Sequence, residues 1–234
     1  MNEIRFRHEY KYPVTDAEIA MLKIRLKTIV HCDPHALNGM YNIRSLYFDD
    51  YNDRCFVENT EGTDPREKFR IRIYNHSDER ITLECKRKER GKTLKTSCPL
   101  TRKETEQLIT GEYLRNISEQ SPLLRRLTVG MMTQRMMPVV IVEYDRIPYV
   151  YKNGNVRITF DTNVSSSSDI SGFFDDNIAK RPIMPHGMQL MEVKFDEFLP
   201  DHIYKTLSLE GLRQTTYSKY YLCRKFETKH RGEK

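Results

Sequence analysis

Alternation of apolar and polar residues is the dominant pattern along this chain of 234 residues. In a strand, residues two apart share one face, so alternation of this kind predicts β-strands. The predicted strands cover residues 4–12, 42–49, 68–74, 80–88, 93–98, 139–151, 156–161, 188–198 and 218–226. A turn at Asn153-Gly154 joins two of them, which is typical of a hairpin.

Three stretches follow helical periodicity instead. Helix is predicted over residues 16–30, over much of 101–136, and over 201–209. The start signals are the capping-box pairs Thr15/Glu18 and Thr101/Glu104, and the pair Ser121-Pro122. Because strands and helices do not alternate regularly, a doubly wound parallel sheet is disfavoured. The pattern favours a single α+β domain over 1–234, with a core of about 4–226 and a frayed tail at 227–234. Its expected architecture is a closed antiparallel eight-stranded β-barrel with helices packed on its outside.

Cations gather on the polar faces of these strands. Arg70 and Arg72 share one face of their strand, and Lys86 and Lys88 share one face of the next. An amphipathic strand normally turns its polar face to water. Helices wrapped around a barrel would cover the apolar faces, and the charged faces would then point into the lumen. Clustered cations there repel each other, so the pattern predicts a polyanionic ligand or a water-filled interior.

Composition limits the remaining possibilities. Lys and Arg number 39 against 33 Asp and Glu, and the net charge of +6 fits nucleic acid, anionic lipid or a phosphate ligand. The five Cys include no CxxC pair, which indicates reduced thiols rather than disulfides or a zinc site. The N-terminus resembles no signal peptide, and no apolar stretch is long enough to span a membrane. We therefore expect a cytoplasmic protein without a P-loop, and no nucleic acid as partner.

Eight short motifs occur in a fixed order along the chain. They are RHEYKY at 7–12, SLYFD at 45–49, KFRIRIY at 68–74, LECKRK at 83–88, EYDR at 143–146, VRITFD at 156–161, MEVKF at 191–195 and YSKY at 217–220. Each motif alone is weak. Together, over about 5–226, they resemble the VTC domain, the polyphosphate polymerase branch of the triphosphate tunnel metalloenzyme (CYTH-like) superfamily.

The resemblance implies a role for each matching position. The implied catalytic, phosphate-gripping residues are Arg70, Arg72, Lys86, Arg146, Arg157 and Lys219. The implied substrate-binding residues are Lys11, Glu9, Tyr144, Ser218, Lys88, Lys194, and Lys92 or Lys95. Glu192 matches the carboxylate that binds a divalent metal, Mn²⁺ or Mg²⁺. The implied ligands are ATP and inorganic polyphosphate, and the family also implies a membrane-protein partner that would supply any membrane association.

One departure from the wider superfamily bears on the reaction. Hydrolytic and cyclase members typically open with ExExK, whereas this chain has Arg7 at the first carboxylate position and keeps only Glu9 and Lys11. One carboxylate fewer weakens metal binding or water activation at that end. The resemblance therefore favours transfer of the γ-phosphate of ATP to a growing polyphosphate chain. A metal-dependent triphosphatase and a non-catalytic polyphosphate- or nucleotide-binding module remain alternatives.

Overall fold

The computed structural model describes residues 7–231. The strands are β1 (His8–Thr15), β2 (His31–Cys32), β3 (Tyr41–Asp49), β4 (Arg66–Tyr74), β5 (Ser77–Glu89), β6 (Lys92–Leu100), β7 (Met137–Tyr151), β8 (Val156–Ser167), β9 (Arg181–Pro182) and β10 (Met188–Phe195). The helices are α1 (Asp16–Leu26), α2 (Arg54–Glu61), α3 (Arg102–Ile109), α4 (Pro122–Gln134), α5 (Asp201–Leu207) and α6 (Lys219–Arg231). Short 3₁₀ turns lie at η1 (Leu37–Gly39), η2 (Ile117–Glu119) and η3 (Asn153–Asn155).

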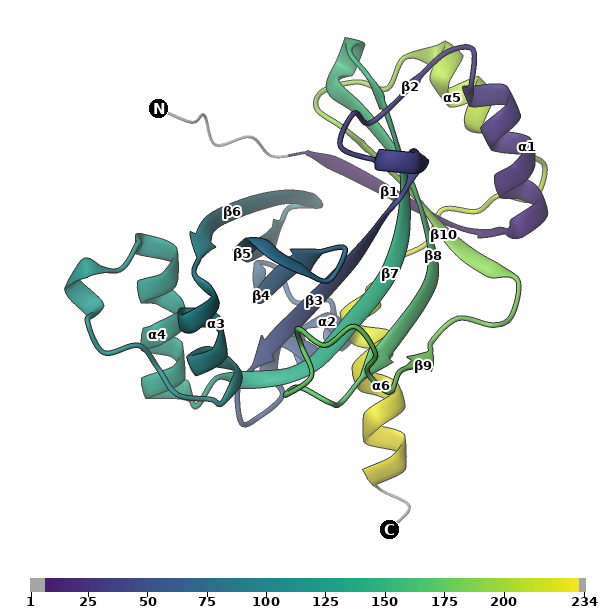
Figure 1. Ribbon diagram of the computed structural model, residues 1–234. Helices are drawn as coiled ribbons and strands as arrows, with labels where there is room; N and C mark the ends of the chain where they lie inside the picture. The colour runs from purple at the N-terminus through teal and green to yellow at the C-terminus, as the bar shows by residue number, and fades with distance from the viewer. Residues whose placement is uncertain (1–6, 232–234) are drawn as a thin grey trace.

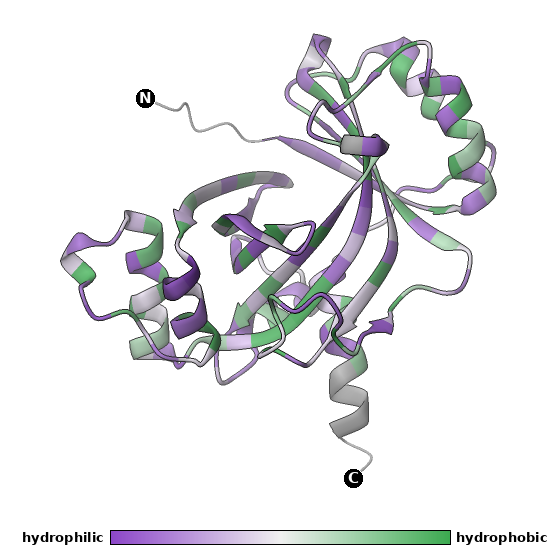
Figure 2. Ribbon diagram, viewed as in Figure 1, coloured by the Kyte–Doolittle hydropathy of each residue, from purple (hydrophilic) through white to green (hydrophobic). Residues whose placement is uncertain are grey.

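All strands belong to one antiparallel sheet that curls into a half-barrel (Figure 1). The strand order is β1-β10-β8-β7-β3-β4-β5-β6, with β2 added to β7 and β9 added to β8. Figure 2 shows hydrophilic and hydrophobic positions alternating along these strands, as the sequence predicted. Many charged strand residues face the cavity on the concave side, and the helices cover apolar clusters on the convex side.

The predicted closed barrel is wrong. Within residues 7–231, edge strands β1 and β6 meet at one bridge only, where Arg7 and Thr93 exchange backbone hydrogen bonds of 3.1 and 3.2 Å. Further along β1, the carbonyl of Lys11 accepts a hydrogen bond from the backbone N–H of Thr215 at 2.9 Å. The segment before α6 thus occupies an edge group of β1 that a fully closed barrel would pair with a neighbouring strand.

Helices cover the convex side in two groups, as expected. Helices α3 and α4 pack on β3–β6 through a cluster that includes Leu108 and Leu127 against Ile71 and Leu83. Helices α1 and α5 cover β8 and β10 at the other end of the sheet (Figure 1). These apolar contacts hold the opposite, charged faces of the strands toward the interior.

The predicted helix starts are confirmed. Capping boxes are present at Thr15/Glu18 and Thr101/Glu104. Ser121 caps α4, with Pro122 at the first helical position. Helix α1 ends at Leu26 rather than at residue 30, and α5 ends at Leu207. Residues 4–6 of the first predicted strand lie outside the described part of the chain.

The predicted last strand, 218–226, is wrong: this segment begins α6. Ser218 Oγ accepts a hydrogen bond from the Tyr221 N–H at 3.3 Å, the contact of an N-cap. Tyr220 and Cys223, three residues apart, pack side by side into the concave side of the sheet. The expected frayed tail is helical as far as Arg231, and 232–234 lies outside the described residues.

Helix α2, which was not predicted, starts at paired aspartates. Asp50 Oδ1 accepts a hydrogen bond from the Arg54 N–H at 3.0 Å, and Asp49 Oδ1 accepts from the Cys55 N–H at 2.8 Å. Together with α6, it fills one end of the concave side through a cluster that includes Cys55, Tyr220 and Val142. Beyond this cluster, the charged residues of the concave side surround an open space.

A candidate phosphate-binding cavity

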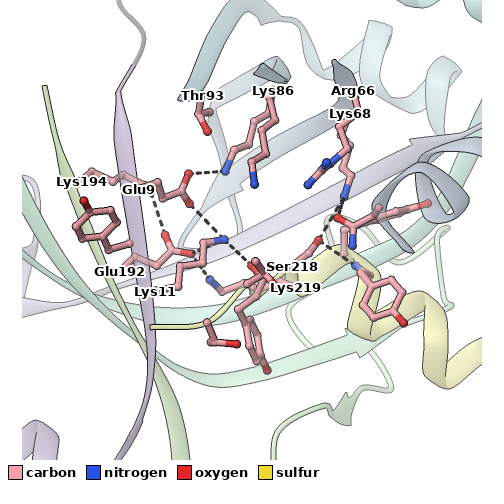
Figure 3. A pocket seen from close by; sticks show the side chains of 18 of the residues that line it. Glu9, Lys11, Arg66, Lys68, Lys86, Thr93, Glu192, Lys194, Ser218 and Lys219 are labelled. Atoms are coloured by element: carbon pink, nitrogen blue, oxygen red, sulfur yellow. Dashed lines mark hydrogen bonds and ion pairs between the residues drawn. The ribbon is translucent and has the colours of Figure 1, made fainter. Parts of the chain in front are cut away.

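A cavity of about 690 Å³ lies on the concave side, bordered by β1, β10, β7, β4, β5 and the segment 214–221 (Figure 3). Most of the predicted site residues line it: Glu9, Lys11, Arg70, Arg72, Lys86, Lys88, Tyr144, Arg146, Glu192, Lys194, Ser218 and Lys219. These residues come from distant parts of the sequence, and the curled sheet brings them together.

One wall is formed by the paired strands β1 and β10. Their register sets Lys11 opposite Glu192 and Glu9 opposite Lys194. The ammonium of Lys11 lies 3.3 Å from Glu9 and 3.6 Å from Glu192. Glu9 also accepts a hydrogen bond from Lys86 at 2.7 Å (Figure 3). Both carboxylates therefore lie close to one lysine and hold cations at the cavity wall.

The floor of the cavity is a buried charge network. Arg146 makes two hydrogen bonds to the Asp161 carboxylate, at 2.6 and 2.7 Å. Lys219 lies 2.5 Å from Asp161 and 3.0 Å from Glu192. Its ammonium is 4.7 Å from the centre of the Tyr144 ring. Buried charges are costly unless paired, so this network fixes the position of both cations.

The opposite wall is formed by β4 and β5. Arg70 donates hydrogen bonds to Glu84 at 2.8 and 2.6 Å, and to the Tyr47 hydroxyl at 2.9 Å. Arg72 donates to the Tyr144 hydroxyl at 3.3 Å. The cross-strand pairing of Arg70 with Glu84 sets this geometry. One carboxylate thereby orients the guanidinium groups that border the cavity.

Three predicted site residues do not line the cavity. Arg157 lies outside the lining, where it donates to Asp33 at 2.8 Å and to the Tyr41 hydroxyl at 2.9 Å. Lys92 is exposed at the start of β6. Lys95 also lies outside the lining, although its ammonium reaches Glu84 at 3.0 Å. Arg7 is tied to Asp196 at 2.9 Å, away from the cavity lining.

The cations keep the carboxylates ionised. Burial alone would raise the pKa of Glu192, but Lys194, Lys219, Lys11 and Arg146 together lower it well below its usual value. Glu9 follows the same logic, because burial is outweighed by Lys11, Lys86 and Lys194, and its pKa is well below the usual value. Burial lowers the pKa of Lys86 to about 8 despite the neighbouring Glu9. The site is thus predominantly cationic near neutral pH, with anions set among the cations.

Among the described residues, Glu9 and Glu192 are the carboxylates that line the cavity. Within residues 7–231, no three His, Cys, Asp or Glu side chains gather in a way that could hold an ion. Mg²⁺ and Mn²⁺ in phosphate-binding sites usually take one or two carboxylates and complete their shell with phosphate oxygens and water. Glu192 with Glu9, which both contact Lys11, fits that pattern.

Sequence reasoning missed several residues at the rim of the cavity. Lys68 and Arg66 of β4 line it. Asn59 and Thr60 reach it from α2, and residues 214–217 line it ahead of α6. Alternation along β4 places Lys68 and Arg66 on the same face as Arg70, but it does not show that they reach the cavity. No periodic signal marks the irregular segment 214–217.

The first prediction concerns acid stability. Burial alone would raise the pKa of Glu84, but Arg70, Arg72 and Lys95 lower it far below its usual value of 4.5. The stabilisation from a carboxylate with a depressed pKa is present above pH 4.5 and is lost as the pH falls below that value. Between about pH 5 and pH 3, the free energy of unfolding should therefore fall more steeply for the native chain than for Glu84→Gln. Urea titrations over this range measure both slopes.

The matched control is Glu112→Gln, which removes an exposed carboxylate. It should keep the pH slope of the native chain. Equal slopes for Glu84→Gln and the native chain would contradict the role given to Glu84.

The fold and the site together form a curled antiparallel sheet that cups a cation-lined cavity, with carboxylates among the cations. The chain belongs to the VTC domain family, whose model matches residues 6–227. The family resemblance seen in the eight motifs is thereby confirmed.

Solved structures share this fold at low sequence identity. The chain is similar to a candidate adenylate cyclase from Bacillus halodurans, with a TM-score of 0.52, 14% identity, and coverage of 91% of this chain and 95% of that chain. It is also similar to a candidate adenylyl cyclase from Hippeastrum with a dominant triphosphatase activity. That comparison gives a TM-score of 0.56 and 12% identity, and covers 95% of this chain and 96% of that chain. A search of curated proteins finds no match.

Proposed function

We propose that this protein is a polyphosphate polymerase that transfers the γ-phosphate of ATP to the end of an inorganic polyphosphate chain. The observation that carries the proposal is the cavity itself, where Arg70, Arg72, Arg146 and Lys219 border one space together with the carboxylate of Glu192. Guanidinium and ammonium groups in such an arrangement suit a linear polyanion. VTC family membership points to the same ligand.

Phosphoryl transfer asks mainly for alignment and charge stabilisation. In the proposed reaction, the bond from the γ-phosphorus to the β,γ-bridging oxygen breaks, and a bond from a terminal oxygen of the acceptor chain to that phosphorus forms. ADP leaves with the bridging electrons. The acceptor phosphate is largely ionised at neutral pH and needs no general base. The roles of Arg70, Arg72, Arg146 and Lys219 are to grip phosphate oxygens and to stabilise charge on the leaving group.

Glu192, with Glu9 beside it, would hold the divalent metal that family membership suggests. The metal supplies Lewis-acid neutralisation of phosphate oxygens when bound. Lys11, Lys194 and Lys219 contact Glu192 in the free protein. Phosphate oxygens offer these lysines alternative partners, which would release the carboxylate for the metal.

The position of Arg7 supports transfer over hydrolysis. The side chain replaces the first carboxylate of ExExK and is tied to Asp196, outside the cavity lining. This end of the cavity therefore has one fewer group able to orient or activate water. The acceptor would then be a phosphate chain in preference to water.

The second prediction tests the reaction directly. Purified protein with ATP and Mn²⁺ should form long-chain polyphosphate that is visible on a gel, with ADP released in step with chain growth. Free phosphate without chain growth would replace the proposal with triphosphatase activity. Tight polyphosphate binding without ATP turnover would replace it with the non-catalytic binding module. A parallel incubation with inorganic triphosphate and metal separates hydrolysis from transfer.

Among the described residues, no helix has the length and apolar character needed to cross a membrane.

A further inference from the structure

Carboxylates are unevenly distributed around the cavity. The inner cations face Glu9, Glu84, Asp161 or Glu192 within ion-pair distance: Lys11, Arg70, Arg72, Lys86, Arg146, Lys194 and Lys219. At the rim, Arg66, Lys68 and Lys88 have no carboxylate partner within the described part of the chain. Within residues 7–231, no carboxylate lies within ion-pair distance of the positive charges at this rim.

Lys68 is the best defined of the three rim cations. Its ammonium donates to Asn59 Oδ1 at 2.8 Å and to Ser218 Oγ at 3.3 Å. It also lies 4.8 Å from the centre of the Tyr220 ring. Neutral partners from α2 and the start of α6 thus hold the ammonium at the cavity surface, while its charge remains free to attract an anion (Figure 3).

The three rim cations continue the row of inner cations. In the register of β4 and β5, Arg66 lies opposite Lys88, Lys68 opposite Lys86, and Arg70 opposite Glu84. Arg66, Lys68, Arg70 and Arg72 share one face of β4 and extend over about 20 Å of strand at the usual rise per residue. An inorganic triphosphate is far shorter than this row. A longer chain is needed to contact both the inner cations and the rim.

We propose that Arg66, Lys68 and Lys88 form a second phosphate-binding subsite, which holds the part of a polyphosphate chain that extends beyond the three phosphates at the inner cations. The subsite rests on the proposed function, because it assigns a place to the polymer that the reaction extends. It makes the protein select long chains over triphosphate. Its ligand is linear inorganic polyphosphate, recognised by charge and not by a nucleobase.

The charge state of Lys68 gives an independent readout. Burial lowers the pKa of Lys68 to about 7, and Arg66, Lys86 and Lys11 act in the same direction. The Cys55 thiol faces the same ammonium from α2 and stays neutral, because burial raises its pKa. A phosphate chain near Lys68 would raise the pKa of the ammonium again. Long-chain binding should therefore take up protons near neutral pH.

The third prediction is a loss of chain-length selectivity. Isothermal titration calorimetry would compare inorganic triphosphate with long-chain polyphosphate on the native chain, Lys68→Gln and Arg66→Gln. Each variant should bind long-chain polyphosphate about tenfold more weakly, as expected for loss of one charged contact. Affinity for triphosphate should stay within about twofold, since the inner cations are unchanged. Lys103→Gln, which removes an exposed cation on α3, is the matched control.

Two results would overturn the subsite. One is unchanged affinity of both variants for the long chain, and the other is an equal loss of affinity for the long chain and for triphosphate. Proton uptake, measured by repeating titrations in buffers of different ionisation enthalpy, should accompany long-chain binding to the native chain and decrease in Lys68→Gln. Failure of the proposed function looks different: the native chain would then make no polyphosphate from ATP, whatever the selectivity of the variants.

Discussion

Replacing Glu192 by glutamine is expected to lower the rate of polyphosphate synthesis by about three orders of magnitude, the effect of losing several kcal/mol of metal-assisted charge stabilisation. Binding of inorganic triphosphate without metal should hold or strengthen, because the neutral amide no longer competes for Lys11, Lys194 and Lys219. Steady-state ADP release measures the rate, and calorimetry measures binding. The expected signature is loss of turnover with retained affinity.

Glu197→Gln is the matched control, because it makes the same chemical change at an exposed position just after β10. It should keep the native rate. A folded Glu192→Gln protein with native turnover would remove Glu192 from the reaction. Arg70→Ala should also lose activity, by about two orders of magnitude, since it removes a charge-assisted contact to phosphate.

The largest effect on stability is expected for Asp161→Ala. This carboxylate is completely buried and pairs with both Arg146 and Lys219. Removing one partner from a buried ion pair leaves uncompensated charge, so the free energy of unfolding should fall by about 3–5 kcal/mol. Urea unfolding at neutral pH without ligand measures the change.

Inorganic triphosphate offers a check on the cause. An anion bound to Arg146 and Lys219 would replace part of the missing charge, so the ligand should stabilise Asp161→Ala more than the native chain. Asp176→Ala removes an exposed carboxylate and should change stability by less than about 0.5 kcal/mol. Native-like stability of Asp161→Ala would show that the floor network does not hold the fold.

Local periodicity was sufficient to predict which way the strands face. The alternation of Arg70 and Arg72 with Ile71 and Ile73 predicted a charged interior, and the isoleucines do pack under α3 and α4. Closure of the sheet could not be predicted in this way. Closure depends on which segment forms hydrogen bonds with the edge of β1. Here the backbone N–H of Thr215, far away in sequence, donates a hydrogen bond to the carbonyl of Lys11.

Ambiguous periodicity explains the error at α6. The sequence YSKYYLCRKF is rich in aromatic residues that favour strands, yet Tyr220 and Cys223 also fit a helical face. Packing of these residues against α2 and the concave side of the sheet stabilises the helix over a strand. A cap at Ser218 was the signal available in the sequence.

The candidate site was predictable in its cations and less so in their partners. Family motifs placed Arg146, Lys219 and Glu192 in one cavity, as observed. Arg157 turns instead to Asp33, whose position depends on the loop after β2 and cannot be read from strand alternation. The sequence did not predict that the rim cations form a separate group, because the distribution of carboxylates around a cavity becomes visible only in three dimensions.

Lys219 and Ser218 follow every strand that the structure describes in chain order. When translation has completed the last of these strands, Ser218 and Lys219, which border the cavity, have not yet been synthesised. Until they emerge, Asp161 lacks one of its two cationic partners, and the Lys11 carbonyl lacks Thr215. Nascent chains should consequently acquire phosphate affinity late in translation, after most of the hydrophobic packing is complete.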